Sequence, residues 1–374
     1  MICKPIEDCL KIVEGGIACE DQKLLAAYIR KCFETENIYT DVEQLNKYLG
    51  LIKYLPYERL FEWEAFCIAL HLCTFWRDTG HGFIALESLC LASPYSRLPQ
   101  YDVDICANAE EQAMRPVNDL LEVLENARHR KKLQRHFYWT KEKIIGLKYR
   151  GTIKGRTNNP KSKDGMRSGI VIFNEIHQYQ NYDNIKVFVT GLGKKKHPRR
   201  LYATSNGDTR QGPLDDLLAR SDQILRGEIG DNGLLPFVCR LDNKTEVDNP
   251  EMWVKANPSL PYLPDLQAVI EKEYAEWKEN PIANADFMTK RMNLPQSDAE
   301  VVVTDWENIK ATNRELPDLT GWACVCGVDY ASVSDFASVN LHFRKGDERY
   351  WINHSWLCLQ SKDLHRLTIP YREW

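Results

Sequence analysis

The chain has 374 residues, 43% of them hydrophobic and 27% charged, and its formal net charge is −4. This length and composition indicate a globular protein with room for two domains. They exclude a protein that coats nucleic acid over its whole surface, and the lack of any run of eighteen apolar residues excludes a membrane-spanning helix. Any contact with DNA must therefore come from a local basic patch.

The twelve cysteines include no C-x-x-C pair. Their spacing therefore suggests neither a zinc site nor a disulfide framework, and we expect reduced, mostly buried thiols. The first residues lack the apolar stretch of a secretory signal. We expect a cytoplasmic protein.

Along the chain, apolar residues first recur at helical spacing and later gather into short strands separated by helices. Buried strands that alternate with helices are typical of a mostly parallel sheet, so the predicted fold class is α/β. The sequence predicts helices over residues 22–36, 57–78 and 109–128, an antiparallel excursion over 137–157, and strands over 101–107, 170–173, 201–204 and 237–241.

The pattern changes after residue 241. Asn-Pro pairs break residues 241–313 into short helices and turns, which indicates a helical subdomain. After Pro317 the sequence predicts three strands over 323–329, 337–344 and 349–356. Because tight turns join them, they must pair antiparallel. A helical segment from Lys362 is expected to follow.

The strand at 170–173 ends in Asn174 and Glu175. In ATP-hydrolysing motors, an amide or carboxylate near Mg²⁺ and a second carboxylate that orients water stand at this edge of a strand. The simpler alternative is an acid that caps the next helix. A motor also needs a phosphate-binding loop, G-x-x-x-x-G-K-[ST], and no such string occurs in this sequence.

A second apolar strand, near residues 201–203, ends in Thr204, Ser205 and Asn206. Small hydroxyl and amide side chains at this place suit a group that senses the γ-phosphate by hydrogen bonding. A strand followed by an ordinary polar turn explains the same residues equally well.

Together these segments resemble the large terminase subunit of tailed bacteriophages, the motor that pumps DNA into proheads and cuts it. The resemblance runs from about residue 57 to the end. It is carried by residues 163–167 leading into 170–179, by 202–207, and more distantly by 253–260, 288–294 and 327–330.

The resemblance implies roles for individual residues. Glu175 is then the catalytic carboxylate of the ATPase, and Asn174 stands where many relatives carry a metal-coordinating Asp. Thr204, Ser205 and Asn206 match the motif that couples hydrolysis to movement. Trp63 falls where the family has an aromatic near the adenine, but Glu64 replaces the usual Gln. A buried aromatic on a helix is the simpler account of Trp63.

The main departure from the family lies between Asp78 and Phe83. Four residues there cannot supply both a strand and a phosphate loop, because extended backbone covers at most about 3.6 Å per residue. Gly82 then stands as the surviving first residue of the helix over 83–91. We expect negligible ATP hydrolysis, and we expect the sheet either to pair differently or to be weakened where the central strand is missing.

The basic run at residues 194–200 precedes the second strand and suits DNA phosphate or a neighbouring subunit's nucleotide, although a solvated loop explains it as well. His177 has no obvious ligand partners in the sequence, and we interpret it as structural.

The last segment resembles the start of an RNase H-like nuclease. By that resemblance Asp329 is a metal-binding carboxylate and Asp335 is a second one, although a surface turn explains Asp335 equally well. Two-metal hydrolysis needs several converging carboxylates. The family's remaining acids come from later elements, so we expect a truncated, inactive nuclease.

The resulting hypothesis divides the chain into an N-terminal helical region (1–56), an ATPase-like domain (57–240), a helical subdomain and linker (241–316) and a truncated nuclease domain (317–374). By resemblance the cofactors are ATP, Mg²⁺ and a divalent nuclease metal, Mg²⁺ or Mn²⁺. The implied partners are double-stranded DNA, a portal protein, the small subunit and further copies in a ring, within a bacterial host cell. The alternatives are a non-enzymatic remnant that keeps only DNA- or partner-binding surfaces, and a defective prophage product with no retained role.

Overall fold

The computed structural model describes residues 2–36, 38–55, 59–74, 84–157, 167–207, 209–210, 212–230, 233–295, 306–330 and 336–357. The chain divides into two compact units, Met1–Val301 and Val302–Trp374. Within the described ranges, no helix is long and apolar enough to cross a bilayer.

The first unit begins with helices. They are α1 (Lys4–Gly15), α2 (Glu20–Thr35), α3 (Val42–Leu49), α4 (Glu62–Ile68), which continues into the π-helical turn η2 (Ala69–Cys73), and α5 (Ile84–Ala92). Local signals explain their starts: α1 has a proline in its first turn, and Asp41 caps α3 by accepting from the Gln44 amide at 2.9 Å. The helix predicted over 22–36 is confirmed as α2. The one predicted over 57–78 is described only between residues 62 and 73.

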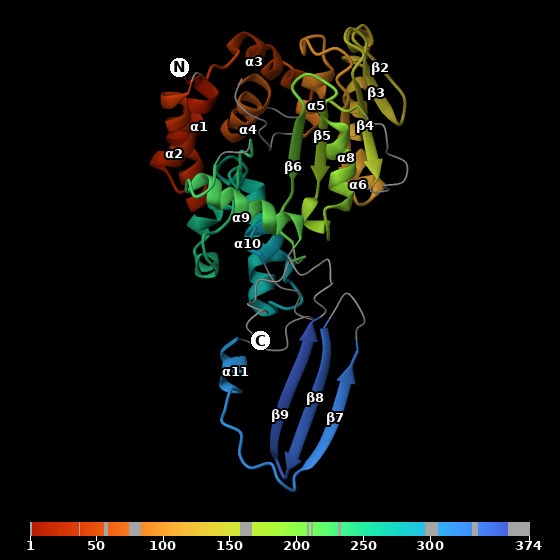
Figure 1. Cartoon of the computed structure of the whole chain (residues 1–374). Helices are drawn as coiled ribbons and strands as arrows, with labels where there is room; N and C mark the ends of the chain where they lie inside the picture. Colours follow the sequence, from red (N-terminus) through yellow and green to blue (C-terminus); the bar gives the residue numbers. More distant parts are fainter. Residues whose placement is uncertain are drawn as a thin grey trace. The chain divides into compact units, whose positions relative to one another are not determined.

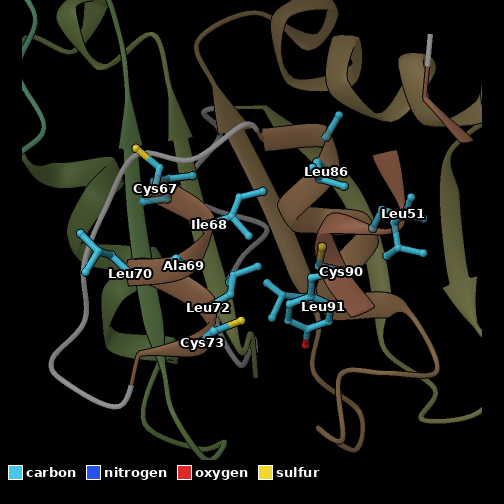
Figure 2. Close-up of a cluster of buried hydrophobic side chains, with 14 of the residues drawn as sticks. Leu51, Cys67, Ile68, Ala69, Leu70, Leu72, Cys73, Leu86, Cys90 and Leu91 are labelled. Carbon is cyan, nitrogen blue, oxygen red and sulfur yellow. The ribbon is translucent and has the colours of Figure 1, made fainter. Parts of the chain in front are cut away.

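The main core of this unit includes the region where α4 and η2 meet α5. Figure 2 shows part of this cluster, with Ile68 of α4, Leu72 of η2 and Leu86 of α5. The pair His71 and Glu87 lies buried in the same region, with 2.8 Å between Nδ1 and Oε1. These contacts join the two helical segments on either side of residues 75–83.

A six-stranded sheet follows in the order β2-β3-β4-β1-β5-β6. The strands β4, β1, β5 and β6 are parallel, whereas β2, β3 and β4 form an antiparallel meander, so the predicted mostly parallel sheet and its antiparallel excursion are confirmed. Figure 1 shows β4, β5 and β6 running in the same direction. The strands are β1 (Val103–Ala107), β2 (Phe137–Trp139), β3 (Lys143–Gly146), β4 (Thr152–Thr157), β5 (Ile170–Asn174) and β6 (Arg199–Ala203).

Helices cover both faces of the sheet. The connecting helices are α6 (Glu110–Glu125), α7 (Arg130–Leu133), α8 (Asp183–Gly191) and α9 (Pro213–Leu225). Successive side chains of β5 alternate between the faces, as the strand period of two requires. Ile170 and Ile172 join the cluster that contains α5 and α6, whereas Val171 and Phe173 join the cluster that contains α8 and α9. The buried strand expected at 170–173 is thus confirmed, with a different helical layer on each face.

The strand β6 pairs on one side only, with β5, among the described strands. The amide of Arg199 donates to Gly169 and the carbonyl of Ala203 accepts from Glu175, so residues 199, 201 and 203 direct their backbone groups to β5. The backbone groups of Arg200 and Tyr202 therefore face the other edge. The sequence-based expectation concerned a missing central strand near residues 79–82, and residues 75–83 lie outside the described ranges.

The strand predicted over 237–241 is wrong. These residues are irregular and extended, because their partners are not another strand. The carbonyl of Cys239 accepts from the Asn293 side chain at 2.8 Å, and the amide of Leu241 donates to Met292 at 3.1 Å. Phe237 instead stacks on Trp63. Residues 237–241 are mostly apolar because they are packed between helices, not because they belong to a sheet.

Residues from 241 to 294 build a helical subdomain with its own core. Its longest helix is α10 (Pro264–Glu279), and Trp253, Trp277 and Phe287 are its largest buried side chains. This agrees with the sequence-based expectation of a helical segment after residue 241.

The second unit contains α11 (Trp306–Ala311) and an antiparallel sheet of β7 (Ala323–Asp329), β8 (Phe336–Lys345) and β9 (Glu348–Leu357). The three predicted strands and their antiparallel pairing are confirmed. All seven residues of β7 are exposed, including Cys324 and Cys326, so the expectation of buried thiols fails there. Eight described cysteines of the first unit are buried.

Candidate active site at the carboxyl edge of the sheet

The backbone turns sharply at Glu175, directly after β5. Its φ of 54° and ψ of 50° lie in the left-handed region, which an L-residue adopts at a cost of about 1–2 kcal/mol. Two hydrogen bonds hold the turn: the Glu175 amide donates to Ala203 at 2.8 Å, and the Gln178 amide donates to the Glu175 carbonyl at 3.0 Å. Strained backbone of this kind gathers at functional sites, and here it directs the carboxylate away from the strand.

His177 links Glu175 to the end of β6. Its Nδ1 atom lies 3.2 Å from Oε2 of Glu175 and 2.8 Å from Oγ1 of Thr204. The Thr204 hydroxyl donates to the Ser205 carbonyl at 2.6 Å and accepts from the His177 amide at 3.2 Å. Because that hydroxyl has spent its only hydrogen, it can only accept from the imidazole, which assigns the proton to Nδ1. The proton is then also directed toward the carboxylate of Glu175.

Asn174 faces a different element. Its side-chain amide donates to the Gln112 carbonyl of α6 at 3.3 Å, a long and weak bond. The amide oxygen is the atom that could ligate a cation, and it competes poorly with a carboxylate for Mg²⁺. Asn174 and Glu175 are thus adjacent in sequence but make contact with opposite neighbours, α6 and β6.

The coupling segment predicted at Thr204–Asn206 is used for packing. Asn206 forms two hydrogen bonds with Asn293: its amide donates to the Asn293 side chain and its own side chain donates to the Asn293 carbonyl, each at 3.1 Å. Arg210 donates to the carbonyl of Gly207 and to Asp215. The two bonds to Asn293 fasten the segment after β6 to the helical subdomain, and the bond of Arg210 to Asp215 fastens it to α9.

Trp63 lies half-buried against the core. Its indole Nε1 donates to the Ser259 hydroxyl at 3.1 Å, and its ring stacks on Phe237 with 6.1 Å between centroids. Glu64, which replaces the expected Gln, caps its own helix by accepting from the Phe61 amide at 2.8 Å. Burial raises the pKa of the Glu64 carboxyl. Both side chains are thus held by contacts within the protein.

A cavity of about 480 Å³ opens beside the end of β6. Its walls come from α4, α5, α6, α9 and the segment around residue 239, and they include Trp63, Thr204, Ser205 and Asn206. Asn174 and Glu175 are not among its described lining residues. The structure therefore brings the coupling residues and Trp63 to one cavity, and joins Glu175 to them only through His177.

The described lining of this cavity does not fit a nucleoside triphosphate. Its charged members are Asp119 and Arg240, and the Arg240 guanidinium is held by the buried Asp21 carboxylate at 2.7 and 3.1 Å. An acid and a committed cation cannot balance the charge of three phosphates. ATP and Mg²⁺ thus find no counter-charge in this part of the wall.

The remaining predicted residues lie elsewhere. Asp329 is exposed at the end of β7, paired in register with Ser338. Gly82 and Asp335 lie outside the described residues, as do the segment at 163–166 and the helix predicted from Lys362. Within the described part of the chain, no three His, Cys, Asp or Glu side chains are grouped so as to hold a metal ion.

Two residues of this edge make contacts that the sequence does not predict. His177, which we interpret as structural, contacts Glu175 and Thr204. Asn293 has a φ of 52° and joins Asn206 to Cys239. The position of His177 two residues after an acid was a usable signal. Asn293 had none in the sequence, because its partners are 54 and 87 residues away.

Family models match most of the first unit and the segment that follows it. The model for the terminase large subunit ATPase domain matches residues 97–223, and that for the terminase large subunit endonuclease domain matches residues 228–368. Two consecutive domains of one family occur here in one chain. The chain belongs to the terminase large subunit family.

Individual relatives agree with this membership. The terminase large subunits of Lactococcus phages p2 and SK1 are each 26% identical to this terminase over 204 residues, which cover 54% of the chain and 37% of each relative. Protein YmfN of Escherichia coli K12 is 20% identical over 224 residues, 56% of the chain and 49% of that protein. This terminase chain thus spans less than half the length of the curated relatives it matches.

A solved structure shows the same fold. The crystal structure of the HK97 bacteriophage large terminase superposes with a TM-score of 0.56 at 16% identity, covering 85% of this terminase and 68% of that chain. The likeness supports the mixed α/β first unit and a nuclease-like second sheet.

Proposed function

We propose that this chain serves viral DNA packaging as a terminase large subunit, and that it does not itself hydrolyse ATP. Membership in the family supports the first part. The second part is supported by the sequence, which contains no phosphate-binding G-x-x-x-x-G-K-[ST] string. The single observation that supports both is the carboxyl edge: Glu175 follows β5 as the acid of such a motor would, and the one cation in the described lining of the cavity at the end of β6, Arg240, is paired with Asp21.

In a motor, the acid after this strand orients the attacking water while loop amides and a lysine stabilise the charge on the phosphates. Here Glu175 keeps a carboxylate about one third exposed, at 36% of its full accessible surface, with His177 beside it. Removing single charge-stabilising donors costs about 3–4 kcal/mol each in transition-state energy. Without those donors, a carboxylate alone gives negligible turnover. The Asn174 amide would also bind Mg²⁺ more weakly than an Asp carboxylate at the same position.

DNA cleavage follows the same logic. A two-metal nuclease needs several carboxylates converging on ions about 3.5–4 Å apart. Asp329 is the one predicted metal ligand within the described residues, and it stands exposed at the end of β7. We propose that Asp329 and Asp335 contact a divalent metal, and that these two acids by themselves do not support DNA cleavage.

We propose that its partners are double-stranded DNA, a portal, a small terminase subunit and further copies of the large subunit. The proposed location is the cytoplasm of a bacterial host. We assign residues 57–240 to the ATPase-like domain, 241–316 to the helical subdomain and 317–374 to the nuclease domain.

A non-enzymatic remnant is the second candidate. It is favoured by the use of Asn206 and Thr204 in fixed internal hydrogen bonds to Asn293 and His177, which leaves less of the coupling segment available to sense a phosphate. Such a remnant would keep partner-binding surfaces only. It predicts that the chain retains a portal or small subunit in pull-down without affecting packaging.

The decisive experiment deletes the gene from the phage or prophage that carries it and counts DNA-filled particles. We expect the count to fall, and to be restored equally by the wild-type chain and by Glu175→Gln. An unchanged count after deletion would reject the packaging role. Restoration by the wild type alone would show that the Glu175 carboxylate performs hydrolysis after all.

A further inference from the structure

The loops that enter the parallel strands meet at the amino edge of the sheet, opposite Glu175. Residues 147–151 lead into β4, 167–169 into β5 and 192–198 into β6. Because β4, β1, β5 and β6 are adjacent and parallel, these loops lie in a row. The cations on this row, called here the amino-edge surface, are Lys148, Arg150, Arg167, Lys194, Lys195, Lys196 and Arg200.

Tyr101 fixes this row. Its hydroxyl donates to the His197 carbonyl at 2.5 Å, and Arg199 donates back to that hydroxyl at 2.9 Å. Tyr101 also lies close to the other two loops. A Cβ on Gly169 would lie 2.4 Å from the Tyr101 ring, and one on Gly151 would lie 2.6 Å from the Tyr101 carbonyl. The loops into β5 and β6 thus pack on the buried side chain of Tyr101, and the loop into β4 packs on its backbone carbonyl, so the fold sets their spacing.

The amino-edge surface has little negative charge of its own. Residues 147–151, 167–169 and 192–200 contain no Asp or Glu, although the whole chain carries a net charge of −4. Two acids of the described residues lie nearby: Asp102 is half-buried and accepts from the Thr152 amide at 2.9 Å, and Asp104 is buried and accepts from the Ser168 hydroxyl at 2.5 Å. Burial raises the pKa of the Asp102 carboxyl, against the opposing effect of Lys195.

Most of these cations extend into solvent. All except Lys195 are exposed. Among the described residues, Arg150, Arg167, Lys196 and Arg200 form no ion pair with a carboxylate, whereas most cations of the helical subdomain do. A local excess of positive charge on an acidic protein is the electrostatic footprint of a polyanion site.

We propose that the amino-edge surface binds the phosphate backbone of duplex DNA without reading its sequence. Four strands at about 4.8 Å spacing place the outer loops about 14 Å apart, a span that faces about four phosphates along one strand at 3.4 Å per base step. A rigid row of cations matches a rigid, evenly charged rod. Lysine and arginine contacts to phosphate position a duplex but do not discriminate bases.

This inference rests on the proposed packaging role for its biological meaning, but the binding itself is measured without packaging. If deleting the gene leaves packaging unchanged but the purified chain binds DNA at this surface, the packaging role is rejected and the DNA-binding surface stands. If packaging depends on the chain but this surface does not bind DNA, the packaging role stands and the DNA-binding surface is rejected.

The test is fluorescence anisotropy of the full chain with a labelled duplex of about 30 base pairs, titrated between about 50 and 200 mM salt. One variant carries Lys194→Ala, Lys196→Ala and Arg200→Ala; a second carries Arg150→Ala and Arg167→Ala from the other two loops. The control carries Lys23→Ala, Lys244→Ala and Lys272→Ala, which are exposed and removed from this edge. Thermal unfolding checks that every variant is folded.

We expect the triple variant to bind roughly tenfold more weakly, with a slope of log K against log salt concentration that is shallower by about 2 to 3. For the double variant, the slope should be shallower by about 1 to 2. The control should bind like the wild type, and duplexes of different sequence should bind alike. No binding by the wild type at the lowest salt would overturn the proposal, as would equal losses in the triple variant and the control. An effect of the triple variant alone would reject a footprint that spans the row. Equal competition by polyglutamate would indicate an acidic protein partner in place of DNA.

Discussion

The imidazole of His177 lies between the ends of two neighbouring strands, with Nδ1 at 3.2 Å from Oε2 of Glu175 and at 2.8 Å from Oγ1 of Thr204. Glu175 follows β5 and Thr204 follows β6. Thr204 in turn precedes Asn206, which is bonded to Asn293 in the helical subdomain. The Glu175 carboxylate is therefore connected to that subdomain through the contacts of His177 and Thr204 and the two hydrogen bonds of Asn206.

The Thr204 hydroxyl should matter for stability more than an ordinary helical hydroxyl does. Thr204→Val keeps the shape but leaves the His177 backbone amide without its acceptor and the imidazole with Glu175 alone, which should cost about 1–3 kcal/mol in the free energy of unfolding. Urea denaturation followed by circular dichroism measures it. The control is Thr190→Val, whose exposed hydroxyl bonds only to its own helix and should change stability by less than about 0.5 kcal/mol. Equal effects would show that His177 does not depend on Thr204.

Glu175 should carry a conformational penalty that glycine removes. Glu175→Gly and Glu175→Ala both delete the carboxylate, but only glycine adopts a φ of 54° without strain. We expect the glycine variant to be the more stable by about 1 kcal/mol, a rise of a few degrees in melting temperature. Calorimetry on the two variants decides it. An alanine variant as stable as the glycine variant would mean that the turn is not left-handed in solution.

Replacing one member of the buried pair His71 and Glu87 should destabilise the protein strongly, whereas replacing both should change its stability little. Their side chains are 1% and 0% exposed, and His71 Nε2 and Glu87 Oε2 have no partner among the described residues. His71→Leu or Glu87→Leu alone strands a buried polar group and should lose about 3–5 kcal/mol.

The variant with both substitutions leaves no polar group behind. Its free energy of unfolding should lie within about 1 kcal/mol of the wild-type value or exceed it. Urea unfolding of the four proteins forms a double-mutant cycle. If the double variant lost the sum of both single effects, the pair would not be coupled.

The thiols should divide sharply by reactivity. Burial raises the pKa of Cys9 to about 12 and that of Cys67 well above its usual range, so neither forms the reactive thiolate at pH 8. Cys324 and Cys326 are exposed on β7. A short pulse of iodoacetamide, read by peptide mass spectrometry, should label the β7 pair in native protein and Cys9 and Cys67 only in urea. Native labelling of Cys67 would contradict the buried core around α4.

Much of the fold could be predicted from local patterns. The apolar run at 170–173 predicted a buried strand because β5 has a helical layer on each face, and the turn at residues 345–347 forced β8 and β9 to pair antiparallel. The failure at 237–241 has a physical cause: burial between Trp63 and the helical subdomain gives the same apolar signature as a strand.

The candidate site was predictable only in part. Glu175 could be found from its place after a buried strand, but its left-handed turn is held by a hydrogen bond to Ala203 at the end of β6, which no local pattern predicts. Asn206 was expected to sense a phosphate, and it bonds to Asn293 in the helical subdomain. Pairings over such separations leave no local periodicity, so they appear only in the folded protein.

The most direct measurement is phosphate release from ATP by the purified chain, with Mg²⁺, in the presence and absence of duplex DNA. Glu175→Gln, which keeps the shape and removes the charge, is the matched control. We expect the two proteins to release phosphate at the same rate as buffer alone. Turnover by the wild type that disappears in Glu175→Gln would contradict the claim that this terminase chain does not hydrolyse ATP.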